Sequence, residues 1–177
     1  MVTKLLKITG LFLLLVTLTG CPGEEDCFDM GSTARVDDLI KIEPLQTTYN
    51  QGDFITFKTE IPAQNNYFGE PINLFEKTND YSARLVNTSV YLFPDNEVRY
   101  LKGSIEAYDG GWSNVIYNPE TDSYELEIRV KLNRTGNYSF STGDYFQFQG
   151  STKCNRYRLD TNIEGWNSVG KIEFTVQ

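Results

Sequence analysis

Apolar and polar residues alternate with a period of two along much of the chain. The clearest example is residues 123–132 (SYELEIRVKL), where Tyr, Leu, Ile, Val and Leu occupy every second position between charged residues. Side chains of a β-strand point alternately to its two faces, so this pattern predicts a strand with one buried and one solvated face. The same alternation predicts further strands at residues 35–43, 53–61, 83–93, 97–108, 137–141, 144–149 and 171–176.

Short segments rich in Asn, Asp, Gly and Pro separate these strands, as turns do. They lie at residues 50–53, 94–96, 109–111, 118–119 and 134–137. Many short strands with evenly spaced turns are typical of an antiparallel sandwich or barrel. Helical periodicity is restricted to residues 71–80 (PINLFEKTND), where Pro71 would take the first position of a short helix. We therefore expect an all-β domain over residues 35–177.

Two segments resemble parts of immunoglobulin-like β-sandwiches. Residues 132–138 (LNRTGNY) are similar to the tyrosine corner, in which a Tyr after a turn hydrogen-bonds to backbone a few residues upstream. Residues 49–57 (YNQGDFITF) are similar to the entry into an early strand of such domains. The resemblance implies an antiparallel, immunoglobulin-like β-sandwich with Tyr138 at the corner. The inter-sheet cysteine pair of antibody domains is absent, so the likeness is one of architecture.

The first twenty residues have the pattern of a cleaved signal peptide. Two lysines precede an apolar run at residues 8–18 (ITGLFLLLVTL), which is shorter than the roughly 20 residues that a membrane-spanning helix needs. The sequence Leu18-Thr19-Gly20-Cys21 that follows resembles the lipobox of bacterial lipoproteins. The resemblance implies cleavage after Gly20 and attachment of lipid to the sulfur of Cys21. The alternative is an ordinary secreted protein in which this cysteine is incidental.

An acidic segment follows the predicted lipidation site. Residues 22–26 (PGEED) resemble the export signal that places lipoproteins of the Bacteroidota on the outer face of the outer membrane, although a solvated linker is an equal alternative. Two or more acyl chains anchor a protein stably in a bilayer. We therefore expect a signal peptide over 1–20, a lipidated acidic linker over 21–34, and a domain that the lipid holds at the bacterial outer membrane, exposed at the cell surface.

The net charge and the remaining cysteines limit the partners and the compartment. The chain carries a formal charge of −8, and loss of the two signal-peptide lysines makes it more negative. Such a surface repels the phosphates of nucleic acid, so we expect no nucleic-acid partner. With Cys21 assigned to lipid, Cys27 and Cys154 form a pair that an oxidising compartment favours as a disulfide. The alternative is two unpaired buried thiols.

The sequence offers few candidates for catalysis or metal binding. It contains no histidine, which removes the commonest general base and metal ligand. A carboxylate-based hydrolase that acts on extracellular glycans needs only Asp and Glu, and remains the alternative function, but no pair of acids stands out. Residues 160–165 (DTNIEG) approach a calcium loop, yet the twelfth position is Lys171 where such loops need Glu. We expect a polar turn there, and neither catalysis nor a cofactor.

The two tryptophans are the best candidates for binding. Residues 111–115 (GWSNV) and 165–169 (GWNSV) echo each other, and both place Trp after Gly in turn-like sequence. With Tyr108 and Tyr117 near Trp112, an aromatic platform for sugar rings or partner side chains is one reading. The other is that Trp112 and Trp166 each lie buried at an open end of the sandwich. We therefore predict a non-catalytic binding or envelope-assembly module with a glycan or protein partner.

Overall fold

The computed structural model describes residues 31–86, 96–105, 112–141, 143–150 and 155–177. Nearly all regular structure in these ranges is β-strand, which confirms the all-β prediction. The predicted lipidation site Cys21, the predicted disulfide partners Cys27 and Cys154, and Tyr108 lie outside the described residues, as do the predicted signal peptide and most of the linker. Among the described residues, no helix has the length and hydrophobicity to cross a membrane.

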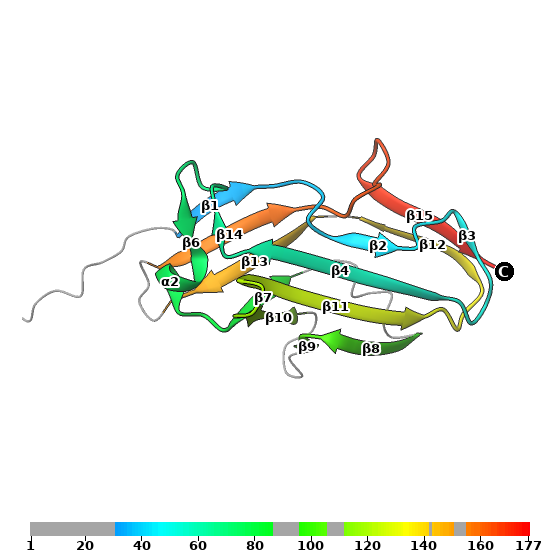
Figure 1. The fold of residues 1–177 in the computed structure, drawn as a ribbon. Coiled ribbons are helices and arrows are strands. Elements are labelled where there is room, and N and C mark those ends of the chain that lie inside the picture. Colours follow the sequence, from blue (N-terminus) through cyan, green and yellow to red (C-terminus); the bar gives the residue numbers. More distant parts are fainter. Residues whose placement is uncertain (1–30, 87–95, 106–111, 142, 151–154) are drawn as a thin grey trace, which may run out of the picture.

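The largest sheet follows the order β1-β14-β13-β7-β10-β11-β4-β2, with β8 added to β11 and β9 added to β10 (Figure 1). The bounds of its strands are β1 Ser32–Arg35, β2 Lys41–Glu43, β4 Phe54–Pro62, β7 Ser82–Val86, β8 Glu97–Lys102, β9 Ser104–Ile105, β10 Trp112–Asn118, β11 Ser123–Lys131, β13 Asp144–Gln149 and β14 Arg156–Thr161.

This sheet curls because the chain crosses from one of its edges to the other between β1 and β2. β1 pairs with β14, whereas β2 pairs with β4 at the far end of the strand order. Between them, Ile40 forms a bridge with Ile163 just after β14. On the other side, the Thr59 hydroxyl of β4 donates to the Leu39 carbonyl at 2.8 Å. The two edges are thereby brought together into a half-barrel.

A smaller sheet of β12 (Gly136–Ser141), β15 (Lys171–Val176) and β3 (Thr48–Tyr49) lies beside the half-barrel (Figure 1). β12 pairs with β15, and β13 pairs with β14, so one long hairpin contributes to both sheets. A third element is the small pair β5 (Gln64–Asn65) and β6 (Ile72–Asn73), which leads into helix α2 (Leu74–Thr78).

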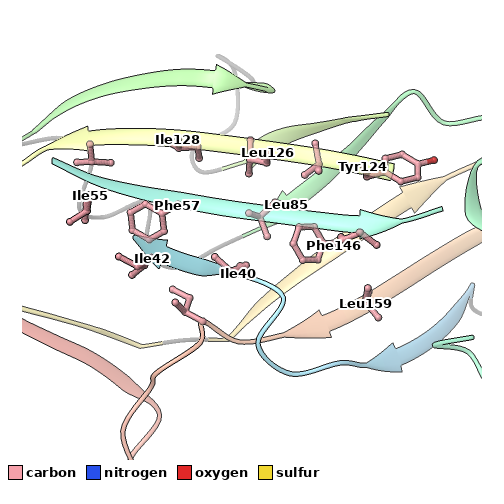
Figure 2. Packing of buried hydrophobic residues seen from close by; sticks show 14 of the residues in the cluster. Ile40, Ile42, Ile55, Phe57, Leu85, Tyr124, Leu126, Ile128, Phe146 and Leu159 are labelled. Atoms are coloured by element: carbon pink, nitrogen blue, oxygen red, sulfur yellow. The ribbon is translucent and has the colours of Figure 1, made fainter. Parts of the chain in front are cut away.

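The core lies between the inner faces of these strands, as Figure 2 shows for the half-barrel. The alternation predicted for residues 123–132 is confirmed, since Leu126, Ile128 and Val130 are at most 3% exposed. Other strands of the sheet contribute Phe57 from β4 and Phe146 from β13 to the same cluster. Burial of each large side chain of this kind stabilises the fold by about 1.5–3 kcal/mol.

The predicted tyrosine corner has the expected contact. The Tyr138 hydroxyl donates to the Arg134 carbonyl at 2.7 Å, and the Tyr138 ring stacks on Phe174 of β15 at 5.0 Å. Tyr49 of β3 packs edge-on against the same Phe174 and donates its hydroxyl to the Pro44 carbonyl at 2.6 Å. The two tyrosines thus fix the flanking strands β12 and β3 to β15.

The strand arrangement differs from the antiparallel sandwich predicted. β1 pairs in parallel with β14, and β15 pairs in parallel with β3, so both larger sheets are mixed. The chain first runs as β1 alongside β14 of the last hairpin. It then crosses to the opposite edge of the sheet, where β2 pairs with β4. This connection is long-range and leaves no pattern in the local sequence.

Several element boundaries also differ from the predictions. The strand predicted over 35–43 is interrupted at Asp38, whose φ of 63° is incompatible with an extended strand, and the one over 97–108 is interrupted at Gly103 with φ 83°. The helix begins at Leu74 and not at Pro71, because the Asn73 side chain accepts a hydrogen bond from the Glu76 amide and caps it there. The strands β10 and β14 were not predicted at all.

Candidate binding surface

The structure does not bring the predicted binding residues together. Trp112 is the first residue of β10, so its turn-like assignment was wrong, and Trp166 lies in the loop between β14 and β15, away from β10 (Figure 1). Tyr117 also lies in β10, but five residues from Trp112. Side chains alternate along a strand, so Trp112 and Tyr117 point to opposite faces of the sheet. They do not form a shared platform.

Tyr117 belongs to an aromatic cluster between helix α2 and the sheet. Its ring stacks on Phe75 of α2, with centroids 3.9 Å apart, and it contacts the buried Tyr124 of β11 at 5.3 Å. The Tyr117 hydroxyl donates to Asp122 at 2.8 Å, and this bond raises the pKa of Tyr117. These contacts give Tyr117 a structural role at the junction of α2, β10 and β11.

Trp166 is 41% exposed, so neither end of the fold buries it. It lies beside Gly170 within a loop that hydrogen bonds between Asn167 and Lys171 hold closed. Leu45 and Val169, from the same region, are 44% and 71% exposed. Trp166 is therefore a surface residue, in a loop that carries the exposed Val169 and the hydrogen-bonded Asn167 and Lys171.

Trp112 instead belongs to a broad, polar surface on the outer face of β1, β14, β13, β7 and β10. We call this surface the arginine–aromatic face. Pairing across the five strands places its side chains in two full rows and the start of a third. The first row is Arg35, Asp160, Tyr145, Val86 and Trp112; the second is Thr33, Arg158, Gln147, Arg84 and Asn114, with Arg156 and Gln149 beginning a third.

The strand register and the burial of the residues together show which side chains point outward. The residues between these positions on the same strands, such as Leu85, Phe146 and Leu159, are at most 1% exposed and line the core. The rows of the arginine–aromatic face therefore occupy the opposite side of each strand. The inward residue Ser113 of β10 is buried as well, where its hydroxyl meets that of Tyr100 at 2.9 Å.

Arginine side chains lie over both aromatic rings of this face. The guanidinium of Arg84 is 4.9 Å from the ring centroid of Trp112, and that of Arg158 is 3.8 Å from Tyr145. Asp160 holds Arg158 through a hydrogen bond of 2.7 Å. Cation–π contacts of this kind contribute about 0.5–1 kcal/mol at exposed sites. They fix the orientation of rings and guanidinium groups relative to each other.

The face gathers arginines in an acidic protein. Four of the chain's seven arginines lie on it, at positions 35, 84, 156 and 158. Asp160 pairs with Arg158, and Asp37, which follows β1, pairs with Arg35 at 2.8 Å. Sequence analysis missed this surface because β14, which carries Arg156 and Arg158, was not recognised as a strand.

A second feature is a charged groove of about 450 Å³ on the outer face of β2, β4, β11 and β8. Five carboxylates and three lysines line it: Asp38, Glu43, Glu60, Glu125, Glu127, Lys41, Lys58 and Lys102. Two of the lysines are closely paired, Lys58 with Glu43 and Lys102 with Glu125, each at 2.6 Å. These two ion pairs therefore neutralise part of the charge of the groove.

Glu125 is the most constrained acid of the groove. Its side chain is 9% exposed, and it accepts hydrogen bonds from Lys102 at 2.6 Å, Thr121 at 2.8 Å and Asn118 at 3.2 Å. The Lys102 bond is the main cause that lowers the pKa of Glu125, and it outweighs burial, which acts in the opposite direction. A glycosidase acid needs a raised pKa to carry its proton at neutral pH. Glu125 has the opposite property.

The calcium-like segment 160–165 begins within β14, continues through the buried Ile163, and turns only at Glu164 and Gly165. Asp160 is paired with Arg158, Asn162 is buried and accepts a hydrogen bond from the Asp38 amide, and Glu164 pairs with Lys41 at 3.3 Å. The three side chains are committed to different partners. Over the described ranges, no three His, Cys, Asp or Glu residues are grouped so as to hold a metal ion.

Comparison with protein-family models found no match, and comparison with curated proteins found no similar sequence. The function is therefore argued from the arginine–aromatic face and from the N-terminal sequence.

Proposed function

We propose that this protein is a lipid-anchored, non-catalytic binding module of the bacterial outer membrane, which binds a glycan on its arginine–aromatic face. In this proposal residues 1–20 are a signal peptide, Cys21 carries the lipid, and Cys27 and Cys154 form a disulfide. The domain is a variant of the immunoglobulin-like sandwich, an assignment that the Tyr138 corner supports.

The N-terminal sequence and the position of β1 together support the anchor. Gly31 is ten residue steps after Cys21, and an extended chain of that length reaches roughly 33–36 Å. β1 starts at the end of the elongated molecule that also carries α2 and β6 (Figure 1). A lipid on Cys21 would therefore hold that end nearest the bilayer and leave the outer strand faces accessible.

The observation that carries glycan binding is the placement of Trp112 and Tyr145 in one row of the sheet. Both pair with Val86 of the intervening strand β7, so the rings stand two strands apart, roughly 9–10 Å. Aromatic rings offer flat apolar surfaces to sugars, while the neighbouring Asn114, Gln147 and Arg84 supply hydrogen-bonding groups. A short oligosaccharide laid across the strands meets both rings and these donors.

Catalysis is not part of the proposal. Five carboxylates line the charged groove, where a hydrogen bond from Lys102 lowers the pKa of Glu125. On the arginine–aromatic face, Asp160 is bound to Arg158. Glycoside hydrolysis needs an acid whose pKa is raised, and the shift of Glu125 has the opposite sign.

Glycan binding is tested with the full chain, purified in mild detergent, on a glycan array followed by calorimetry with each glycan that binds. We expect Trp112→Ala to weaken binding at least tenfold and Trp166→Ala, the matched control, to leave it unchanged. If binding depends on Trp166 and not on Trp112, the surface is wrongly assigned. If Trp112→Ala does not fold, Trp112→Phe, which keeps an aromatic ring, is used in its place.

The anchor is tested separately by metabolic labelling with palmitate and by protease treatment of intact cells. Wild type should take up label and lose the domain to external protease, whereas Cys21→Ser should take up none. Labelling of the Cys21→Ser variant, or an unmodified thiol at this position in the mass spectrum of the mature protein, would contradict the anchor.

A further inference from the structure

We infer that Leu45, Trp166 and Val169 form a second membrane contact, which rests in the interface of the same bilayer that holds the lipid anchor. We call these three residues the Trp166 tip. The inference rests on the anchor at Cys21 that the proposed function includes, and it adds a surface that the anchor alone does not require. It follows from the exposure of the tip, from the way its loop is held, and from the reach of the N-terminal chain.

The Trp166 tip groups large apolar side chains at the surface of the domain. Leu45 is 44% exposed, Trp166 is 41% exposed and Val169 is 71% exposed. Leu45 packs directly on Gly165, and the Trp166 ring lies against Gly170, so two segments of the chain contribute to one patch. Apolar side chains gathered in this way at a surface mark contacts with other proteins or with membranes.

The loop that carries Trp166 and Val169 is held in one shape by its own hydrogen bonds. The Asn167 side chain accepts from the Val169 amide at 3.1 Å and from the Lys171 amide at 3.0 Å, and it donates to Glu173 at 3.0 Å. The Asn167 amide donates to the Lys171 carbonyl at 2.8 Å. Because the loop is already ordered, little conformational entropy is lost when the tip meets a surface.

The chemistry of the tip suits a bilayer interface. Indole has a large apolar body and one N–H donor, and Trp is enriched where a membrane meets water. Lys171 is exposed at the base of the loop, where a cation is attracted to anionic lipid headgroups. An anchored domain always stays close to the bilayer, so a second contact forms within one assembly and a small apolar patch is sufficient.

The length of the N-terminal chain allows the anchor and the tip to meet one bilayer. Residues 32–41 run alongside residues 157–164 through strand pairing, an isolated bridge and an ion pair, and so form one long side of the domain. Tyr157, level with the start of β1, is nine residue steps before Trp166, a span of at most roughly 32 Å. The ten steps from Cys21 to the first described residue reach roughly 33–36 Å.

This tether is as long as the side of the domain between β1 and the tip. A lipid on Cys21 therefore permits this side to lie along the bilayer, with the anchored end of the domain at one end of the contact and the Trp166 tip at the other. Because β1 is the edge strand of the large sheet, the outer faces of the other strands stay accessible in this orientation.

The test uses the two tryptophans of the chain as reporters. Trp112→Phe leaves Trp166 as the reporter, and Trp166→Phe leaves Trp112 as the matched control. Each lipidated full chain is inserted into phosphatidylcholine vesicles with or without bromine on the acyl chains, since bromine quenches the fluorescence of a tryptophan that it contacts. We expect brominated lipid to lower the fluorescence of Trp166 about twofold and to leave that of Trp112 unchanged.

Two further variants locate the contact, both made in the Trp112→Phe chain. Val169→Asp places a charge in the apolar tip and should abolish most of the quenching of Trp166. Leu101→Asp, at a β8 residue that is 44% exposed and lies away from the tip, is its control and should leave the quenching as it was. Thermal unfolding checks that each variant is folded.

Four results would overturn the inference, and they are distinguishable. Vesicles that carry palmitate-labelled protein without quenching of Trp166 would remove the tip contact and leave the anchor intact. Absence of both the palmitate label and vesicle binding would remove the anchor as well. Equal quenching of Trp166 and Trp112 would show contact without a preferred side. A photoreactive group at position 169 that links to a protein in intact cells, with no quenching by lipid, would assign the tip to a protein partner.

Discussion

Replacement of Glu125 by Gln should destabilise the fold by about 2 kcal/mol at neutral pH. Hydrogen bonds to a charged group contribute about 1.5–3 kcal/mol, and Glu125 receives one from Lys102 together with two from neutral donors. The Lys102 side chain is 51% exposed, so water screens the pair and the lower half of that range applies. Gln keeps one acceptor oxygen, loses the charge, and turns an amide donor toward the cationic Lys102.

The effect of pH has a definite sign. The pKa of Glu125 in the folded protein is lowered from the ordinary value of 4.5. Its stabilising contribution is therefore complete above that value, declines as the pH falls below 4.5, and is lost once the carboxyl is protonated in the folded state too. The difference between wild type and Glu125→Gln should thus be largest at pH 7 and close toward pH 3.

The assay is urea unfolding of the full chain in mild detergent, followed by tryptophan fluorescence at a series of pH values. A loss of about 2 kcal/mol corresponds to a fall of about 4–8 °C in Tm for a protein of this size. Glu127→Gln, on the same strand and face, is the control, because its carboxylate makes none of these hydrogen bonds; we expect a change within about 0.5 kcal/mol. Equal stability of wild type and Glu125→Gln at pH 7, or a gap that persists unchanged at pH 3, would refute the reasoning.

Three further predictions concern the frame of the fold. Tyr138→Phe removes one neutral hydrogen bond but keeps the ring on Phe174, and should cost about 1 kcal/mol in urea unfolding; no loss would show that the corner bond is dispensable. Tyr49→Phe removes a hydroxyl that both donates and accepts, so it should cost about 2 kcal/mol, and a smaller loss than for Tyr138→Phe would contradict this count. Gly103→Ala should cost about 1–3 kcal/mol, because φ is +83° and a Cβ would collide with a backbone carbonyl, whereas Gly143→Ala, with open space around it, should unfold like wild type.

The sequence predicted the strands in which apolar residues dominate the inward positions. Residues 123–131 form β11 as expected, because its inward positions are the large apolar residues Tyr124, Leu126, Ile128 and Val130. β10 was missed since its inward Ser113 is polar, and the fold accommodates that hydroxyl only through Tyr100 of a different strand. β14 was missed since Arg156 and Arg158 dominate it and Leu159 is its only buried aliphatic residue.

Less of the candidate site than of the fold could be predicted from the sequence. Trp112 was predicted to bind together with Tyr108 and Tyr117, which are close to it in sequence. In the structure, Arg84 of β7 contacts Trp112, and Tyr145 of β13 lies two strands away in the same row. Their proximity depends on strand order and register over most of the chain, and a shift of register by one residue would turn each of them inward.

The pairing of β1 with β14 determines how the domain responds to mechanical force. A pull on the residues before Ser32 enters the domain through β1, which pairs in parallel with β14 over Ser32–Arg35 (Figure 1). Tension directed along these strands loads the hydrogen bonds between them at the same time, in shear, and does not open them one after another. Beyond β1, the chain continues into contacts with Ile163 and with β4. Drag on the domain is thereby distributed to both edges of the large sheet before any strand detaches.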